Sequence, residues 1–299
     1  MLLSMSTSAL DSQIAAGLDG RGVIEAISKC GFRAVDYDLT REDVGKPLEN
    51  GKKLREILAE FGVAAPQAHA TGGSLENCFF FCREAGIPAI VVHPIPSPEN
   101  DRKEFFEINQ RHYKAVAGLC DETGVGLLVE NIGNPMDPYF LKSGADLAEL
   151  VDIIDHPLCT ACWDIGHANH FPAENYPQYE SIKALGSRLT AIHFHDNCGN
   201  FNDPDRHIRV DMHMAPFMSW VGTVNFDSVL QGLIDIDYKG TFNLELTAGQ
   251  SRRFVPPFIR NGEAVSRLNY LPTELWIEIY STVYKIGKYM LTEYGVFEG

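Results

Sequence analysis

The sequence has few basic side chains and lacks the signatures of several large protein classes. Its 299 residues contain 25 lysines and arginines against 40 aspartates and glutamates, which gives a formal net charge of −15. A surface of that sign repels a phosphate backbone, so we expect no nucleic-acid partner. The chain also has no GxGxxG or GxxxxGK[ST] loop, and this disfavours a nucleotide-binding protein.

Long apolar runs and paired cysteine motifs are missing as well. No stretch approaches the roughly 20 apolar residues that span a bilayer, so we expect no membrane association. The first ten residues, MLLSMSTSAL, have no basic region and make a poor signal peptide. The seven cysteines are an odd number, and the CxxC of Cys159 and Cys162 has no second pair, so strand packing is the best interpretation of it. This usage disfavours a disulfide framework or a zinc ribbon and predicts a cytoplasmic protein.

What the sequence does contain is a regular alternation of strand-like and helix-like segments. Short aliphatic or β-branched runs bounded by turn residues indicate strands. Eight such runs are present: Leu2–Ser8, Phe32–Leu39, Val63–Ala70, Ala89–Pro94, Gly124–Asn131, Leu158–Asp164, Leu189–Asp196 and Thr241–Leu246. Most recur about every thirty residues, which is the length of a strand–helix unit.

The segments between these runs have the apolar spacing of amphipathic helices. They are Gly20–Gly31, with a glycine suited to a C-cap, Gly51–Gly62, Ser74–Gly86, with a serine suited to an N-cap, Phe106–Gly124, Ser143–Ile154 and Phe226–Ile236. Alternation repeated about eight times predicts an α/β protein with a single-domain (β/α)8 TIM barrel over residues 1–250. A doubly wound sheet is the alternative fold.

The last fifty residues follow a different pattern. Residues 251–272 read as an irregular segment with four arginines, and residues 272–295 read as one amphipathic helix. Leu275, Ile279, Val283 and Ile286 form the predicted apolar stripe of that helix. We expect this extra C-terminal helix to pack on the barrel or to form a contact in a homo-oligomer.

Ionisable residues end six consecutive predicted strands, and active sites of TIM barrels lie at that end of the strands. They are His69, His93, Glu130, Asp164, the pair His193 and His195, and Glu245. Any one of these could be a satisfied core group. Burying so many together is costly unless a cation compensates them.

Four of these residues form a natural metal-binding set: Glu130, Asp164, His193 and Glu245. Three carboxylates and one imidazole suit Mn²⁺, Mg²⁺, Co²⁺ or Zn²⁺. Two carboxylates on opposite sides of a metal can also transfer protons at a carbon next to a carbonyl that the metal polarises. The set therefore predicts metal-dependent isomerase chemistry.

Seven segments in this order resemble the xylose isomerase-like, sugar phosphate isomerase/epimerase superfamily, which includes the apurinic-site endonucleases. The segments are QAHA, VVHP, LLVEN, WDIGHANH, HFHDN, DMHMAPF with GTVNF, and FNLEL. The resemblance implies a TIM barrel in which Glu130, Asp164, His193 and Glu245 bind one metal ion. It further implies that Glu130 and Glu245 are the catalytic acid/base pair, and that His167 lies near substrate oxygens.

The resemblance also extends to the endonucleases, which bind three zinc ions through nine ligands. Every ligand type has a counterpart in this chain, because His69, His93, His167, Asp211 and His213 join the four residues above. We expect one tightly held ion, with these five residues and His195 facing the substrate. In the loop from Asp196 to Met212, Arg206 and Arg209 either bind a carboxylate or phosphate of the substrate or are solvated loop charges.

The lead functional hypothesis is therefore a metal-dependent isomerase or epimerase acting on a sugar or keto-sugar. A lyase that cleaves 3-oxo-glycosides at the same site, an apurinic-site endonuclease and a non-catalytic sugar-binding barrel are the alternatives. The acidic composition and the sugar-type appearance of HFHDN and DMHMAPF favour sugar chemistry. For the aromatic residues Tyr37, Phe201, Phe217 and Trp220, core packing or a lid is favoured over stacking on a sugar ring.

The segment WDIGHANH is the most informative single motif. We interpret Asp164 as a metal ligand at a strand end, Gly166 as a tight turn, and His167 as a residue facing substrate. Asp164 could instead be a helix N-cap. His170 is expected behind the ligands or on the surface.

Overall fold

The computed structural model describes residues 1–70, 73–132, 139–172, 174–175, 177–199, 212–218, 220, 222–247, 258–265 and 271–298. Phe201, Arg206, Arg209 and Asp211, which the sequence singles out, lie outside these residues.

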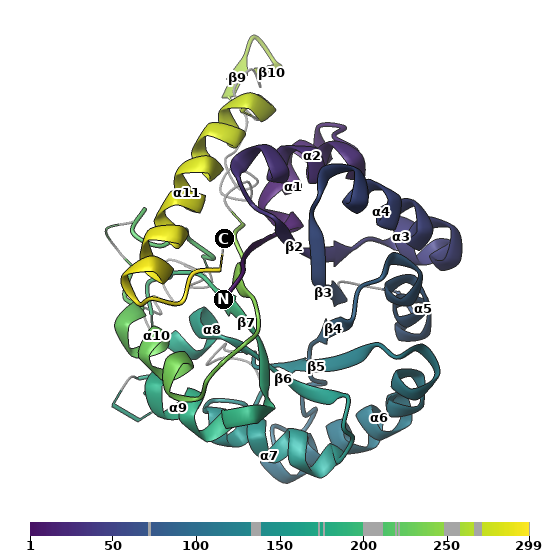
Figure 1. Ribbon diagram of the computed structural model, residues 1–299, viewed down its shortest axis with the longest axis vertical. Coiled ribbons are helices and arrows are strands. Elements are labelled where there is room, and N and C mark those ends of the chain that lie inside the picture. Colours follow the sequence, from purple (N-terminus) through teal and green to yellow (C-terminus); the bar gives the residue numbers. More distant parts are fainter. Residues whose placement is uncertain are drawn as a thin grey trace.

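Eight parallel strands form a closed barrel, as predicted (Figure 1). They are β1 (Leu3–Ser6), β2 (Ala34–Leu39), β3 (Ala64–Ala70), β4 (Ala89–Val92), β5 (Gly126–Glu130), β6 (Cys159–Asp164), β7 (Leu189–Phe194) and β8 (Phe242–Leu244). Pairing of β8 with β1 closes the ring, with Asn243 opposite Ser4. Each strand lies inside a predicted run, so several of the predicted site residues come directly after a strand end.

Helices surround the barrel (Figure 1). The larger ones between strands are α2 (Gly20–Cys30), α4 (Pro47–Phe61), α5 (Leu75–Ala85), α6 (Arg102–Thr123), α7 (Gly144–Ile154), α9 (Gln178–Leu185) and α10 (Phe226–Asp235). Short helical turns add η1 (Thr7–Leu10), α1 (Asp11–Ala15), α3 (Arg41–Gly45), α8 (Ile165–Asn169) and η2 (Gly186–Arg188). Helix α9 and the short turns were not predicted, because segments this short give no clear periodic signal.

Local chemistry explains where the helices begin and end. Gly31 has a φ of 110°, so it terminates α2 in the left-handed region, as predicted for a C-cap glycine. Helix α4 begins four residues earlier than expected, because Pro47 is well suited to the first helical position. Ser74 occupies the N-cap position of α5 but makes no side-chain capping bond, contrary to the prediction.

The hydrophobic core lies mainly between the barrel wall and the helices. Trp163 on β6 is an example: it is fully buried in this outer core, and its indole N–H donates to Gln178 Oε1 on α9 at 3.1 Å. Because strand side chains alternate, the residues beside Trp163 point into the barrel. Cys159 thus packs outside and Cys162 inside, and both are free thiols, which confirms their interpretation as packing residues.

The barrel interior contains a small apolar layer of its own. Val91, Leu128, Cys162 and Ala191, which come from four successive strands, form a separate buried cluster. We call this cluster the lower layer. Two residues further along each strand, on the same inward face, come His93, Glu130, Asp164 and His193. Together with Glu245, which directly follows β8 and groups with Glu130, Asp164 and His193, we call these residues the upper layer.

The C-terminal segment departs from the prediction in two ways. Strands β9 (Phe258–Arg260) and β10 (Glu263–Val265) form a two-stranded antiparallel ribbon inside the region expected to be irregular. Helix α11 (Thr273–Glu293) contacts α2 and β1 (Figure 1). Its buried residues are Trp276, Tyr280, Val283, Gly287, Met290 and Leu291. Of the predicted stripe, Val283 is buried, Ile279 and Ile286 are partly buried against the core, and Leu275 is exposed, so the prediction was wrong at Leu275.

Among the residues that the structure describes, no helix has both the length and the apolar character that a bilayer crossing requires.

Candidate metal and catalytic site

The structure brings Glu130, Asp164, His193 and Glu245 together at the carboxyl ends of β5 to β8. All four side chains are buried, and each offers one nitrogen or oxygen atom within 4.8 Å of the others. His193 lies between the acids. Its Nδ1 is 2.8 Å from Glu130 Oε1, 3.2 Å from Glu245 Oε2 and 3.9 Å from Asp164 Oδ2.

The donor set fits a divalent cation. Two buried carboxylate oxygens, Glu130 Oε2 and Glu245 Oε2, make no well-aligned hydrogen bond among the described residues, although imidazole nitrogens lie 3.0 to 3.3 Å from each of them. Buried acceptors of this kind are rare unless an unseen donor or ion satisfies them. Oxygen-rich coordination with one imidazole suits the hard or borderline ions Mg²⁺, Mn²⁺, Co²⁺ and Zn²⁺.

Two more histidines contact the same carboxylates: His69 on β3 and His93, which directly follows β4. His69 Nε2 lies 3.3 Å from Glu130 Oε2, and His69 Nδ1 lies 3.4 Å from Glu245 Oε1. His93 Nε2 lies 3.0 Å from Glu130 Oε2. His69 is buried while the His93 side chain is about half exposed (49%), so His93 is the histidine of this pair that solvent or a ligand can reach.

Three further histidines form a group at the edge of the site. His167, His195 and His213 each offer a ring nitrogen within 4.8 Å of the others. The rings of His195 and His213 stack with centroids 3.8 Å apart. His195 Nε2 is 3.1 Å from Asp164 Oδ1, and His213 Nδ1 is 3.3 Å from Glu245 Oε2. This group therefore touches the four-residue set through two of its acids.

The segment around Asp164 combines two of the predicted roles. Asp164 ends β6 and is also the N-cap of α8, because its Oδ1 accepts a hydrogen bond from the His167 backbone N–H at 2.6 Å. Gly166 lies inside α8 and not in a tight turn, so that expectation was wrong. A β-carbon at Gly166 would come within 1.9 Å of the His195 ring, which explains the need for glycine.

Two other histidine assignments follow from hydrogen bonds. His167 Nδ1 lies 2.9 Å from the carbonyl oxygen of Asn131, which can only accept, so Nδ1 carries the proton. His170 is buried and its Nε2 lies 3.2 Å from the Asn197 amide nitrogen. His170 therefore supports the loop behind the site, in agreement with the first of its two predicted places.

Electrostatics in the cluster favour charged side chains even without a cation. Burial alone would raise the pKa of Glu130, but the His193 charge, a hydrogen bond with His193 and the nearby imidazoles of His69 and His93 hold it well below its usual value. The pKa of Glu245 is lowered in the same way, chiefly by His193 and His213. Burial lowers the pKa of His193, yet the surrounding thiol and carboxylates raise it well above its usual value.

Sequence reasoning missed several polar residues below the metal-binding set. Asp36, Gln67 and Asn243 are buried inside the barrel, and Asp36 Oδ2 is 2.9 Å from His193 Nε2. The sequence does contain a sign of this network: Asp36 and Asp38 lie two residues apart, and therefore on the same face, in a strand whose other side chains are largely apolar. Of the aromatic residues, Tyr37 is buried and stacks on Phe81, whereas Trp220 is fully exposed, so core packing was wrong for Trp220.

Comparison with known proteins places the fold. A crystal structure of IOLI protein with a binding zinc atom aligns with a TM-score of 0.71 at 15% identity, covering 99% of this chain and 100% of that one. A D-tagatose 3-epimerase-like protein aligns with a TM-score of 0.67 at 20% identity, covering 96% and 98%. At these identities the likeness shows the fold.

Sequence comparison finds an uncharacterized protein of Methanocaldococcus jannaschii that is 28% identical over 166 residues. The match covers 54% of this chain and 52% of that relative, so the chain spans about half the length of the curated relative. A family model covers more: it matches residues 24–268 and confirms the resemblance drawn from the strand-end motifs. The chain belongs to the xylose isomerase-like TIM barrel family.

Proposed function

We propose that the protein is a divalent-metal-dependent sugar isomerase or epimerase. The observation that carries this proposal is the placement of Glu130 and Glu245 at the ends of β5 and β8, with Asp164 and His193 between them. Solved structures of the same fold include D-tagatose 3-epimerase-like and D-psicose 3-epimerase proteins, which supports a sugar as the substrate.

Residues of the upper layer have two proposed roles, cation binding and proton transfer. Glu130, Asp164, His193 and Glu245 would hold the cation. Once bound, the cation would polarise the substrate carbonyl and stabilise the enediolate. Glu130 and Glu245 each keep one oxygen without a well-aligned hydrogen bond among the described residues, and that oxygen can accept or return a proton. The lowered pKa values keep both carboxylates ionised, which is the form that ligates a cation.

Removal of a proton from one face of a carbon and its return on the other face inverts the centre. Glu130 and Glu245 come from strands separated by β6 and β7, so the two carboxylates approach a bound sugar from different sides. This arrangement suits epimerisation as well as transfer of a proton between neighbouring carbons. His69, His93, His167, His195 and His213 line the same side of the barrel and offer hydrogen bonds to sugar hydroxyls.

The test is turnover in D₂O. Free ketoses, aldoses and keto-sugars would be incubated with the protein and Mn²⁺, and recovered sugars analysed by NMR. We expect deuterium at the carbon beside the carbonyl, with loss of turnover in Glu130→Gln and Glu245→Gln. Glu107→Gln, an exposed change on α6, is the matched control. Turnover without deuterium incorporation, or turnover unaffected by both site variants, would contradict the mechanism.

The three-histidine group keeps one alternative open. Additional nitrogen ligands beside a carboxylate set could hold further cations, and multiple-metal sites are typical of phosphoester hydrolysis. Abasic DNA is therefore included in the same assay. Robust nicking without sugar turnover would replace the isomerase proposal with a phosphodiesterase.

A further inference from the structure

Asp36 is a buried carboxylate that the proposed chemistry does not use. It lies on β2 below the metal-binding set and is only 1% exposed. Its Oδ2 makes all of its side-chain hydrogen bonds, while Oδ1 makes none among the described residues. Burying an ionised carboxylate is unfavourable unless its partners compensate for the lost hydration. The partners of Asp36 therefore indicate its role.

The most informative partner is His193. The two ring nitrogens of His193 face different surroundings: Nε2 lies 2.9 Å from Asp36 Oδ2 and 3.2 Å from the Gln67 amide nitrogen, and Nδ1 faces Glu130, Asp164 and Glu245. Asp36 Oδ2 accepts hydrogen bonds from the Gln67 and Asn243 amides, and as an acceptor towards His193 as well it requires the proton on Nε2. In a neutral imidazole, Nδ1 is then the nitrogen with a free lone pair.

From this geometry we infer that Asp36 is a positioning residue for the metal centre, which fixes the tautomer and ring orientation of His193 so that Nδ1 is presented to the cation. This inference rests on the proposed function in one respect: it takes His193 to be a ligand. Carboxylates that accept from the outer nitrogen of a ligating histidine hold the ring and raise its basicity as a ligand.

Neighbouring strands hold Asp36 in turn. Gln67 Nε2 donates to Asp36 Oδ2 at 2.7 Å, and Asn243 Nδ2 donates to the same oxygen at 3.1 Å. The Ser4 hydroxyl donates to Asn243 Oδ1 at 3.0 Å, which directs the Asn243 amide N–H groups towards Asp36. Strand register explains the meeting, because Asp36 pairs with Gln67, and Asn243 pairs with both Ser4 and His193.

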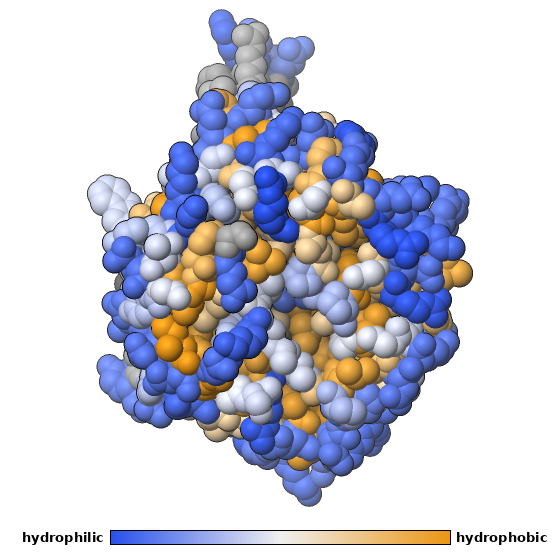
Figure 2. Space-filling view, viewed as in Figure 1, coloured by the Kyte–Doolittle hydropathy of each residue, from blue (hydrophilic) through white to orange (hydrophobic). Residues whose placement is uncertain are grey.

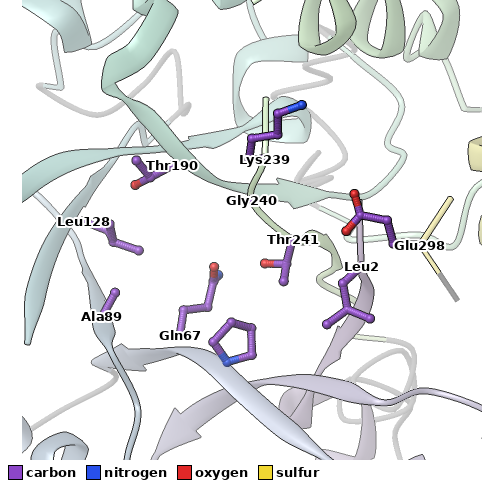
Figure 3. A pocket seen from close by; sticks show the side chains of 10 residues that line it. Leu2, Gln67, Ala89, Leu128, Thr190, Lys239, Gly240, Thr241 and Glu298 are labelled. Carbon is purple, nitrogen blue, oxygen red and sulfur yellow. The ribbon is translucent and has the colours of Figure 1, made fainter. Parts of the chain in front are cut away.

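Gln67 also separates this network from the opposite mouth of the barrel. A cavity of about 290 Å³ opens where the strands begin, and Gln67 lines it together with Leu128, Thr190 and Thr241 (Figure 3). In the view of Figure 2, hydrophilic residues dominate the surrounding rim and hydrophobic residues gather nearer the centre. The Asp36 network thus forms the floor of the metal site, one side chain away from this cavity.

The experiment measures zinc affinity and the His193 tautomer in the full chain. Variants Asp36→Ala and Asp36→Asn would be compared with the unmodified protein by competition titration with Zn²⁺. Asp36→Asn preserves size and one accepting oxygen, so it guards against a folding failure of Asp36→Ala. The matched control is Leu128→Ala, which trims a lower-layer side chain with no ionisable group.

We expect Asp36→Ala to weaken zinc binding about 10- to 100-fold and Asp36→Asn to restore part of that loss. Leu128→Ala should lower the melting temperature without changing zinc affinity. Long-range ¹⁵N NMR of the zinc-loaded protein, with His193 assigned through loss of its signals in His193→Gln, should show a proton on Nε2 in the unmodified chain. In Asp36→Ala that tautomer should no longer be fixed.

Zinc affinity that is the same in both Asp36 variants as in the unmodified chain would overturn the positioning role. An Nε2 that carries no proton in the zinc-loaded protein would do the same. Failure of the unmodified chain to bind Zn²⁺ or Mn²⁺ is a different result, because it removes the proposed metal site itself and this inference with it.

Discussion

The two layers inside the barrel differ completely in chemistry although they belong to the same strands. In the lower layer, Leu128 and Cys162 pack against apolar neighbours. Two residues further along, Glu130 and Asp164 converge on His193. One period of strand alternation, roughly 7 Å of rise, therefore separates an apolar layer from a charged one. Close packing of apolar side chains is enough to stabilise the lower layer, whereas the upper layer requires a bound ion or opposite charges to compensate its buried carboxylates.

The largest effect should come from neutralising one base of the upper layer. Glu130→Gln or Glu245→Gln preserves size but removes a proton acceptor and a negative ligand. We expect turnover of the responsive sugar to fall at least about 10²–10⁴-fold. Steady-state kinetics with Mn²⁺ at saturation measures this, and Glu107→Gln should keep the original rate. A loss below tenfold in both site variants would mean that neither carboxylate transfers the proton.

A carboxylate introduced into the lower layer tests the same difference between the layers in the opposite direction. Leu128→Glu places an acid among Val91, Cys162 and Ala191, which offer no positive charge. We expect a loss of about 3–5 kcal/mol in the free energy of unfolding, the size found for uncompensated buried charges. Urea titration gives the value, with Leu128→Met as the volume-conserving control. Equal stability of the two variants would show that the lower layer is hydrated.

Metal removal should affect stability through the upper layer alone. A ligand that binds only the folded state stabilises it by about 2.7 kcal/mol at 100 times its dissociation constant. We expect chelation to lower the melting temperature and re-addition of Mn²⁺ or Zn²⁺ to restore it. Asp164→Asn should respond less to added metal than the parent chain. A melting temperature that changes with neither chelator nor added metal would argue against a cation between Glu130, Asp164, His193 and Glu245.

The smallest effect is expected at the Cys162 thiol of the lower layer. Burial is the main reason that the pKa of the Cys162 thiol is raised to about 12. Only the thiolate form reacts with alkylating reagents. We expect iodoacetamide at pH 8 to leave Cys162 unmodified in the folded protein while the partly exposed Cys198 reacts first. Mass spectrometry of peptides measures both. Prompt alkylation of Cys162 would mean that the lower layer opens on the timescale of the reaction.

Much of the upper layer was predictable because period-two alternation is visible in the sequence. Once a barrel is assumed, the alternation along each strand predicts that Glu130, Asp164 and His193 point inward. Their positions near the strand ends predict that they lie at the same height in the barrel. The stripe of α11 was wrong at Leu275 because Leu275 and Trp276 are both apolar, and only packing against α2 and β1 shows which one is buried.

Contacts across the barrel were not predictable in the same way. Asp36 and His193 are 157 residues apart and meet only because the barrel closes, which leaves just β8 and β1 between β7 and β2. The stacked pair of His195 and His213 depends on a loop conformation in which His213 has a φ of 31°. Neither feature leaves a periodic signal, since each joins single residues from distant segments.

The outward-facing Trp163 has a consequence for mutational tolerance. A one-residue insertion or deletion within β6 would exchange the two faces of the strand and turn an indole into the barrel in place of Asp164. The hydrogen bond from Trp163 to Gln178, and the bond from Gln178 to the Ile165 carbonyl oxygen at 2.7 Å, oppose that slip. Hydrogen bonds on the outer face of β6 thus fix the direction in which the Asp164 carboxylate points inside the barrel. Changes in chain length should be tolerated in the surface loops long before they are tolerated in this strand.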